Sequence, residues 1–577
     1  MTTPTLILGL PLLAAVLLAF VPRAYGFAIR LGALAATAAS LLLAVVMFIR
    51  FDATAAGFQF VQKVTWVKSL NLSYHVGVDG LNVGLILMGA IVAFAATCVS
   101  WDIKERQKEF YILLLVMTGG ILGAFASLDL FFLYFFHELA LVPTFIMIGV
   151  WGRGPDRTYA AYQITIYLSI GALLALVGLI LLYAQSGANT FSIPDLTAHL
   201  RQHPMSLPMQ HVIFPLLLVG FGILVSLWPF HTWAPLGYGA APTATAMLHA
   251  GVLKKFGLYG LIRLALPMLP DAAQPWMQIV AWLCLGNLLL VGLVAMRQKN
   301  LNLLIGNSSV AHMGFAFLGI ASLTLIGVTG TVMVMIAHGL LAALTFGLSG
   351  WLHAHTGTLE MSEMGGLLKR LRFIGTVFVI AAFAGCGLPG FPNFVGEVMT
   401  FFGAWQSPAL AGPHKFVVLA AYGALIIGAI YMLRAVRQMM HGPLPERWAD
   451  LPDATMLQKI PYVLLLAALL LFGCFPRLLT DQIKPVAAQI VEMATSGNAS
   501  RAIPAAVQSP GTFSALSLTP ALSPGESEQR VQPLADAAAS AADVSPVSQP
   551  AAPQPPPNAD PVAAVAPIRI PPSAIRN

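Results

Sequence analysis

A long apolar segment is interrupted by the sequence Gly387-Leu388-Pro389-Gly390-Phe391-Pro392-Asn393-Phe394-Val395-Gly396-Glu397. Proline removes a backbone donor and clashes with the preceding turn, so a helix that runs through this segment must open there. Inside a bilayer such an opening is tolerated only where protein or water satisfies the freed carbonyl groups. A charged side chain at that depth costs about 2.5–3.5 kcal/mol on insertion scales. A broken span that carries a buried acid therefore indicates an ion-translocating site.

The composition extends this interpretation to most of the 577 residues. Hydrophobic residues make up 58% of the chain and charged residues 9%, with a mean hydropathy of +0.80. Apolar runs of about 18 to 25 residues recur, and each can cross roughly 30 Å of hydrocarbon. The sequence therefore predicts an all-α polytopic membrane protein with about fourteen transmembrane helices. The expected spans are 4–21, 28–49, 81–100, 111–127, 129–151, 159–184, 211–235, 243–266, 276–296, 302–322, 327–353, 372–406, 415–440 and 457–476.

Charges in the loops orient the predicted bundle. Loops after odd-numbered spans carry about sixteen Lys and Arg residues and the other loops about six, and basic loops stay in the cytoplasm. We therefore expect both termini on the periplasmic side of a bacterial inner membrane. The first apolar segment has no basic region before it, so it is expected to be an uncleaved span. The net charge of +7 reflects this bias, and the expected surroundings are membrane lipid, with no nucleic acid bound.

The sequence contains no recognisable cofactor motif. The four cysteines lie singly in apolar spans, without a CxxC pair or a Cys/His cluster, so no metal or iron–sulfur site is expected. No Gly-rich phosphate loop follows a strand, which argues against nucleotide or flavin binding. We therefore expect this chain to hold no redox cofactor.

A second break, at Trp228–Pro235 in the seventh span, mirrors the break in the twelfth span. Paired interrupted helices indicate a repeat, and an odd number of spans per copy makes the copies inverted. Residues 497–577 are rich in Pro, Ala and Ser, and they are expected to be a disordered tail. The predicted domains are 1–110 (spans 1–3), 111–270 (first five-helix repeat), 271–440 (second five-helix repeat), 441–496 (last span and flanking loop) and 497–577 (tail).

Several charged side chains fall at membrane depth. Glu138 lies near the middle of the fifth span, where it is interpreted as a proton carrier or as one half of a helix–helix ion pair. Lys254 and Lys255 lie about a dozen residues into the eighth span, too deep to reach the interface easily. Burial disfavours the charged form of both residue types, which makes proton exchange easy. Arg263, near the end of that span, is expected to anchor the interface.

Histidines form a second group of titratable side chains in the spans. A lone buried histidine is more often a hydrogen-bonded core residue than a proton relay. Several of them beside Glu138, Lys255 and Glu397 favour a chain of titratable groups. His137 can serve the same purpose or simply pack. The histidines inside spans are His231, His249, His312 and His338, in addition to His137.

Local sequences resemble the antiporter-like subunits of the proton-pumping NADH–quinone oxidoreductase, respiratory complex I, a family shared with Mrp-type cation/proton antiporters. The resemblance runs from the third span to the fourteenth and leaves out the tail. Glu397 after the second break favours the subunit M type, because the L, N and Mrp types usually carry lysine there. The sequences that carry the resemblance are Phe135–Trp151, Arg157–Tyr162, Pro229–Pro235, Ala241–Ala244, Gly251–Lys255, Ser308–Gly314, Ala337–Gly339 and Gly387–Glu397.

The resemblance implies two inverted five-helix repeats, each with a half-channel, joined by a polar axis at the bilayer midplane. Glu138 would be the fifth-span acid and Lys255 the connecting lysine. His312 and His338 would be the polar-axis histidines, and Glu397 would be the terminal acid. Neighbouring L-type and N-type subunits are the implied partners, and other subunits would handle NADH, FMN, iron–sulfur clusters and quinone.

One departure from the family pattern bears on activity. The family places a lysine five residues before the proline of Pro-x-His, and this chain has Leu224 there. Either His137, His249 or Lys254 substitutes for that lysine, or the chain is a diverged paralogue that does not pump, since a buried glutamate without a partner becomes protonated. A stand-alone cation/proton antiporter, a hydrogenase-linked membrane subunit and a purely structural scaffold remain alternatives.

Overall fold

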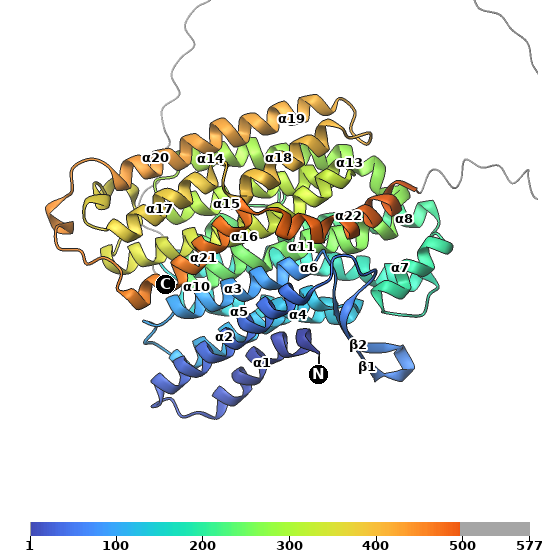
Figure 1. The fold of residues 1–577 in the computed structure, drawn as a ribbon, viewed down its shortest axis with the longest axis horizontal. Coiled ribbons are helices and arrows are strands. Elements are labelled where there is room, and N and C mark those ends of the chain that lie inside the picture. Colours follow the sequence, from blue (N-terminus) through green and yellow to red (C-terminus); the bar gives the residue numbers. More distant parts are fainter. Residues whose placement is uncertain (1, 497–577) are drawn as a thin grey trace, which may run out of the picture. The chain divides into compact units, whose positions relative to one another are not determined.

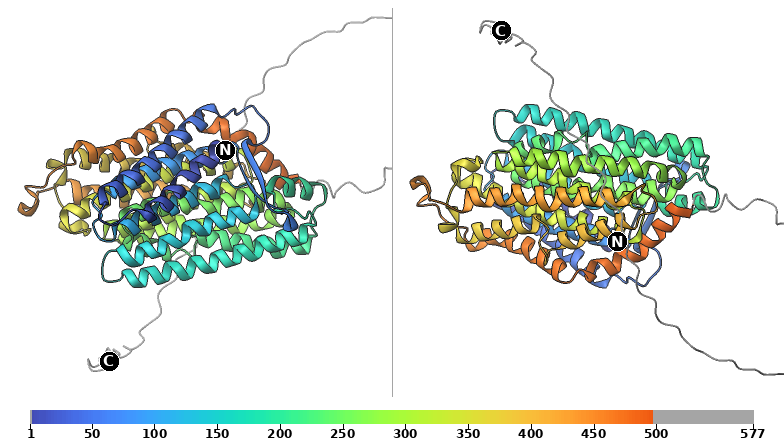
Figure 2. Two further views of the ribbon diagram at one scale, coloured as in Figure 1. Left: turned by 90° about the horizontal axis from the view of Figure 1, so that it is seen from below. Right: turned by 90° about the horizontal axis from the view of Figure 1, so that it is seen from above.

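The computed structural model describes residues 2–496, which form a bundle of long helices. The first two helices lie at one edge of this bundle and α19 and α20 lie at the opposite edge (Figures 1 and 2). Eleven helices of the described part are long and apolar enough to cross a membrane, so the chain is a multi-pass membrane protein. The prediction of a disordered tail at 497–577 lies outside the described residues.

The first half of the bundle runs from the N-terminus to the end of the eighth predicted span. Its elements are α1 (Thr3–Phe20), α2 (Gly26–Arg50), β1 (Gln59–Val67), β2 (Leu72–Val78), α3 (Val83–Val99), α4 (Gln107–Ala126), α5 (Leu130–Trp151), α6 (Arg157–Ser186), α7 (Ile193–Gln202), α8 (Leu207–Val225), α9 (Trp233–Ala240), α10 (Thr243–Leu248), η2 (His249–Leu253), α11 (Lys255–Gly260), η3 (Leu261–Ala265) and α12 (Leu266–Met268). The segments η2 and η3 are π-helical turns, which are wider than α-helical ones.

The second half continues with another set of long helices. Its elements are α13 (Pro270–Leu285), η4 (Gly286–Val291), α14 (Gly292–Arg297), α15 (Leu301–Ala321), α16 (Leu325–Thr356), α17 (Arg372–Gly385), α18 (Pro392–Trp405), α19 (Pro413–Ala421), η7 (Tyr422–Gly428), α20 (Ala429–Met440), α21 (Met456–Cys474) and α22 (Arg477–Ser496), with short 3₁₀ turns at Lys68–Leu70, Met361–Glu363, Leu367–Lys369 and Glu446–Trp448. Both η4 and η7 are π-helical. The three remaining predicted spans, 81–100, 243–266 and 372–406, fall on shorter or interrupted helices. The number fourteen and the inverted repeat therefore stay predictions.

The structure confirms both predicted breaks. Helix α8 ends at Val225, Ser226 adopts a left-handed backbone with φ 67°, and α9 begins seven residues later at Trp233. Helix α17 ends at Gly385, and α18 begins at Pro392. Proline is favoured at this first helical position, because its missing N–H has no intrahelical partner there. The interruptions thus follow from local backbone chemistry.

The centre of the bundle is formed by α15 and α16, whose residues are almost all buried. Helix α16 packs against α15, α18 and α3. Gly330 permits the close approach of α16 to α18, since a Cβ atom there would lie 2.8 Å from the Met399 Cβ atom and 2.9 Å from the Thr400 nitrogen. This packing places the acid-bearing helix α18 directly against the central helix.

The hairpin of β1 and β2, helix α7 between the sixth and seventh spans, and helix α22 were not predicted from the sequence. Strands β1 and β2 form an antiparallel hairpin between the second and third spans, paired from Gln59 with Val78 to Val67 with Leu72. No helix was expected after the span at 457–476, whereas α22 occupies Arg477–Ser496. Apolar residues of α22 at helical spacing, among them Leu479, Ile483 and Ile490, are buried against α16, α12 and α13. The hairpin and α7 lie at the same end of the bundle (Figure 1).

Candidate functional site

Lys255 and His338 form the centre of a buried polar array. The Lys255 Nζ atom lies 2.8 Å from the His338 Nδ1 atom, and both side chains are almost completely buried. Lys255 also donates a hydrogen bond of 2.5 Å to the carbonyl oxygen of Ala250, within the π turn that precedes it. A π turn shifts the regular carbonyl pattern, and such turns are frequent at functional sites. The lysine therefore reaches from α11 to the central helix α16.

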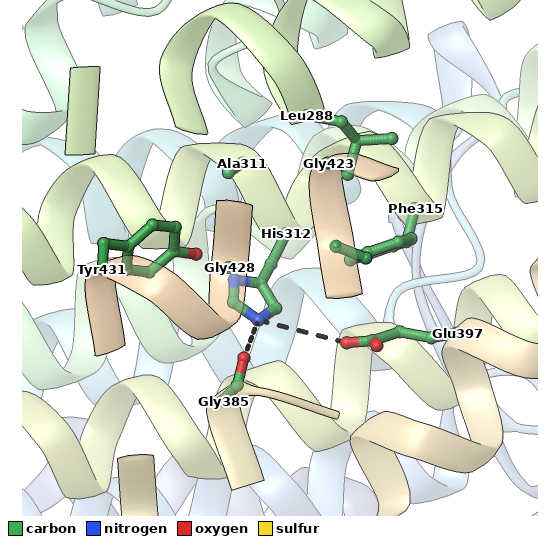
Figure 3. Close-up of a pocket in the computed structure, with 10 residues that line it drawn as sticks. Leu288, Ala311, His312, Phe315, Gly385, Glu397, Gly423, Gly428 and Tyr431 are labelled. Atoms are coloured by element: carbon green, nitrogen blue, oxygen red, sulfur yellow. Dashed lines mark hydrogen bonds and ion pairs between the residues drawn. The ribbon is translucent and has the colours of Figure 1, made fainter. Parts of the chain in front are cut away.

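His312 continues the array toward the second break. Its ring centroid lies 5.5 Å from that of His338, and its Nε2 atom lies 4.0 Å from a carboxylate oxygen of Glu397. The same Nε2 atom lies 3.1 Å from the Gly385 carbonyl oxygen, which belongs to the last turn of α17 (Figure 3). The break between α17 and α18 therefore brings both a free carbonyl group and an acid to one histidine. Lys255, His338, His312 and Glu397 are called the buried row below.

The hydroxyl groups of Ser308 and Tyr431 lie beside the buried row and were not predicted from the sequence. The Ser308 carbonyl oxygen lies 2.7 Å from the His312 Nδ1 atom, and the Ser308 hydroxyl lies 3.1 Å from the hydroxyl of Tyr431. His312, Glu397 and Tyr431 line a cavity of about 10 Å³ (Figure 3), close to the minimum volume for one ordered water of about 10–15 Å³. Ser308 belongs to one of the sequences that carry the family resemblance. Nothing in the sequence around Tyr431 indicates that its hydroxyl group lies beside the buried row.

A glycine in the second break keeps Glu397 in place. Gly387 has φ +69°, and a Cβ atom there would lie 2.6 Å from a Glu397 carboxylate oxygen. An L-residue is disfavoured in this left-handed region, and a side chain would collide with the acid. Gly387 therefore allows the chain to turn and leaves free the space that the Glu397 carboxylate occupies.

Lys254 and His249 lie beside the buried row, toward the first break. The Lys254 ammonium group donates to the Ser309 carbonyl and hydroxyl oxygens at 3.2 and 3.3 Å. The His249 Nδ1 atom lies 3.2 Å from the Tyr238 hydroxyl, and its Nε2 atom is buried without a hydrogen-bond partner in the described part of the chain. The Lys254 ammonium group also lies 5.8 Å from the centroid of the Tyr238 ring, so Tyr238 contacts both residues. The η2 turn that carries His249 packs against α5, and these groups therefore extend the array toward that helix.

Glu138 and His137 lie apart from the buried row, on α5. The His137 Nδ1 atom lies 3.5 Å from a Glu138 carboxylate oxygen, while the Glu138 side chain keeps 32% of its surface exposed. The His137 ring stacks on Phe256 at a centroid distance of 4.1 Å, next in sequence to Lys255. Leu224, where the resemblance implies a lysine, is buried and apolar. His137 is thus a nitrogen-bearing side chain next to Glu138 that also contacts the helix of Lys255.

His231 does not join the array. It lies in the break between α8 and α9, where its Nδ1 atom is 3.2 Å from the Pro229 carbonyl oxygen, and it is partly exposed. This contact is local to the turn. Its candidate role thus has less geometric support than those of His312 and His338.

Arg263 differs from the sequence-based expectation. It does not reach for an interface but is buried, and its two terminal nitrogens each lie 2.6 Å from a carboxylate oxygen of Asp79. The Tyr259 hydroxyl accepts a third hydrogen bond from the guanidinium group, at 3.3 Å. Asp79 lies 184 positions earlier in the chain, so sequence proximity gave no sign of this pair.

The side chains of this array can exchange protons. Among residues 2–496 no group of three or more His, Cys, Asp or Glu residues is arranged to hold a metal ion. Imidazole, amine, carboxylate and hydroxyl groups at these separations can pass a proton along a chain, directly or through one water. The array is therefore suited to proton movement within the membrane.

Comparison with protein families gives a match that covers the whole array. Residues 127–427 match the family described as NADH:quinone oxidoreductase/Mrp antiporter, TM. A Nostoc sp. protein named NAD(P)H-quinone oxidoreductase chain 4 1 is 33% identical over 91% of this chain and 97% of its own length. A Synechocystis sp. protein named NAD(P)H-quinone oxidoreductase chain 4-2 is 35% identical over 76% of this chain and 78% of its own length.

Solved structures show the same fold. A chain of respiratory complex I from Thermus thermophilus is 27% identical, with a TM-score of 0.77 over 85% of this chain and 99% of that chain. A chain of the Mrp complex from Dietzia sp. is 18% identical, with a TM-score of 0.73 over 85% of this chain and 99% of that chain. The second likeness concerns the fold alone.

Proposed function

Since the chain belongs to the family of transmembrane subunits of NADH:quinone oxidoreductases and Mrp antiporters, we propose that it is a membrane-arm subunit of a respiratory NADH–quinone oxidoreductase that translocates protons. The observation that carries this proposal is the buried row, in which a lysine, two histidines and a glutamate follow one another across four helices, the last of which begins at the second break. Charged groups at this depth are costly and are retained where they move ions.

In the proposed pathway a proton passes between Lys255 and His338, then to His312, and leaves through Glu397. The first step needs only a small shift, because the two nitrogen atoms are already in hydrogen-bond contact at 2.8 Å. The last step spans 4.0 Å, and the small cavity beside Glu397 supports a bridging water there. His231 remains a candidate for the entry side of the pathway.

We further propose that His137 takes the place of the missing seventh-span lysine. It lies 3.5 Å from Glu138 and stacks on the residue next to Lys255. A protonated imidazole can stabilise the Glu138 carboxylate as an ammonium group would. His249 and Lys254, which both contact Tyr238, lie between this pair and the buried row.

We propose an assembly for this chain from its resemblance to complex I subunits and from its loop charges. It would sit among other membrane subunits of a bacterial inner-membrane complex, with L-type and N-type antiporter-like chains as neighbours and both termini in the periplasm. Partner subunits would hold the FMN and iron–sulfur clusters and would bind NADH and quinone. Electron transfer there would drive the proton steps in this chain electrostatically.

The decisive experiment measures protons translocated per NADH oxidised by the intact complex in proteoliposomes, for the wild type and for Lys255→Ala. We expect proton translocation to fall about tenfold or more, since removal of a positioned proton-transfer group typically costs at least a hundredfold in rate. The control is Lys484→Ala, which removes an exposed lysine on α22. Unchanged proton stoichiometry and rate in a fully assembled Lys255→Ala complex would exclude the pumping role.

A structural scaffold is the second candidate function, and the apolar Leu224 favours it. If the lost lysine silences the pathway, the buried row serves only to hold helices together. Lys255→Ala would then reduce the stability of the complex without changing its proton stoichiometry.

A further inference from the structure

A cavity of about 440 Å³ opens among α2, α3, α16 and α21, away from the buried row. This volume falls within the usual range of about 300–1,000 Å³ for small-molecule sites. Its polar wall carries Arg153, Thr243 and Trp351, and its apolar wall includes Leu34 and Leu457. Such a combination of a cation with apolar surfaces is suited to an amphiphilic anion.

Arg153 brings a positive charge to this cavity without a matching acid. Its guanidinium group donates a hydrogen bond to the Thr243 hydroxyl, and its backbone nitrogen donates to the Ala240 carbonyl oxygen at 2.7 Å. Within residues 2–496 no carboxylate lies within 4.0 Å of it. Burial lowers the pKa of the Arg153 guanidinium to about 10. Arg153 is half-buried, and a charge held away from water is normally paired.

Trp351 offers a second donor that the protein leaves unused. The residue is only 6% exposed, and its Nε1 atom has no hydrogen-bond partner among the residues described. Its ring stacks on His355 at 3.9 Å, which fixes the indole at the cavity wall. A buried tryptophan N–H usually finds an acceptor. The cavity thus holds one cation without a carboxylate partner and one indole N–H without an acceptor.

The cavity is also accessible to acyl chains. Leu457 and Ile460, at the start of α21, line it while they are 78% and 45% exposed. In a membrane-spanning bundle such apolar side chains face lipid. Asp102 lines the cavity as well, but no ion pair joins it to Arg153, so the guanidinium group stays available for an external anion.

We propose that this cavity binds one anionic phospholipid. Its phosphate group accepts hydrogen bonds from Arg153 and Trp351, because guanidinium groups match the geometry of phosphate oxygens. An acyl chain lies along Leu34 and Leu457 and continues into the bilayer. The site holds α2, α16 and α21 together through a molecule supplied by the membrane.

The test is photocrosslinking of the intact complex in detergent with phosphatidylglycerol that carries a diazirine on one acyl chain. We expect label on the segments 98–103, 347–355 and 457–462, which line the cavity. Arg153→Gln should lower this labelling about tenfold or more, as expected for loss of a charge-assisted hydrogen bond. Trp351→Phe should lower it severalfold with little effect on folding, since the lost N–H has no protein partner.

The matched control is Arg157→Gln, which removes an exposed arginine that lies outside the cavity and should leave the labelling unchanged. Unlabelled phosphatidylglycerol should compete, whereas phosphatidylcholine and inorganic phosphate should not. Labelling of the three segments that persists in both the Arg153→Gln and Trp351→Phe complexes would overturn the proposal. Equal competition by inorganic phosphate or by phosphatidylcholine would overturn it too, because the site would then select a free anion or any lipid.

Discussion

The amine of Lys255 and the imidazole of His338 are in hydrogen-bond contact at 2.8 Å, and the two side chains come from different helices. A single proton between the two nitrogen atoms is enough to form this hydrogen bond, because either the amine donates it to the ring or the ring donates it to the amine. The pair can therefore change which residue holds the charge without breaking the contact between α11 and α16. This exchange is the simplest elementary step that the buried row offers.

Glu397→Gln tests the last step of the proposed pathway. The amide has nearly the same shape as the carboxyl group but cannot release a proton, so we expect proton translocation to fall about tenfold or more while the complex stays assembled. Proton uptake per NADH in proteoliposomes measures the effect. Glu492→Gln, at an exposed ion pair with Arg201, is the control and should have no effect. Normal pumping by the Glu397→Gln complex would remove this residue from the pathway.

Gly387→Ala tests the space around the same carboxylate. A left-handed backbone costs an alanine about 1–2 kcal/mol, and the added Cβ atom would lie 2.6 Å from a Glu397 oxygen. Gly390 has φ +102° and no atom within 4 Å of an added Cβ atom, so Gly390→Ala adds the strain without the collision. We expect Gly387→Ala to reduce proton translocation more than Gly390→Ala does. Equal effects of the two substitutions would show that only backbone strain matters there.

His137→Phe tests the proposed replacement of the family lysine. Phenylalanine keeps an aromatic ring that can stack on Phe256 and removes the imidazole nitrogen that lies 3.5 Å from the Glu138 carboxylate. We expect the rate of proton translocation to fall severalfold, with electron transfer from NADH to an artificial acceptor unchanged. His203→Phe, at an exposed position, is the control. A wild-type rate of proton translocation by the His137→Phe complex would show that His137 does not replace the lysine, and His249 and Lys254 would be the remaining candidates.

The pair of Asp79 and Arg263 predicts a stability effect. Removing one partner leaves a buried charge uncompensated, which costs about 3–5 kcal/mol. We therefore expect Arg263→Met and Asp79→Leu to lower the thermal stability of the detergent-solubilised complex strongly. The double variant should recover most of that loss, because neither charge remains. Additive losses in the double variant would show that the two side chains do not stabilise each other.

Parts of the fold were accessible from the sequence because their causes are local. Proline and glycine chemistry predicted the break before Glu397, and hydropathy predicted that Lys255 and His312 lie inside the membrane. The contact of Lys255 with His338 could not be derived from spacing, since it joins residues 83 positions apart. Arg263 was predicted to anchor the membrane interface because it lies near the end of a span. Its ion pair with Asp79 arises only from tertiary packing.

The π turns at His249–Leu253 and Leu261–Ala265 have a consequence for chain length. Each π turn holds one residue more than the α-helical repeat, and one residue corresponds to a rotation of roughly 100°. A π turn takes up its extra residue by widening, so deleting one residue of His249–Leu253 should restore a regular helix and leave Lys255 on the face toward His338. The deletion would remove the widened backbone around the Ala250 carbonyl group, to which the Lys255 amine donates. The wide turn therefore supplies the lysine with an acceptor and does not set its direction.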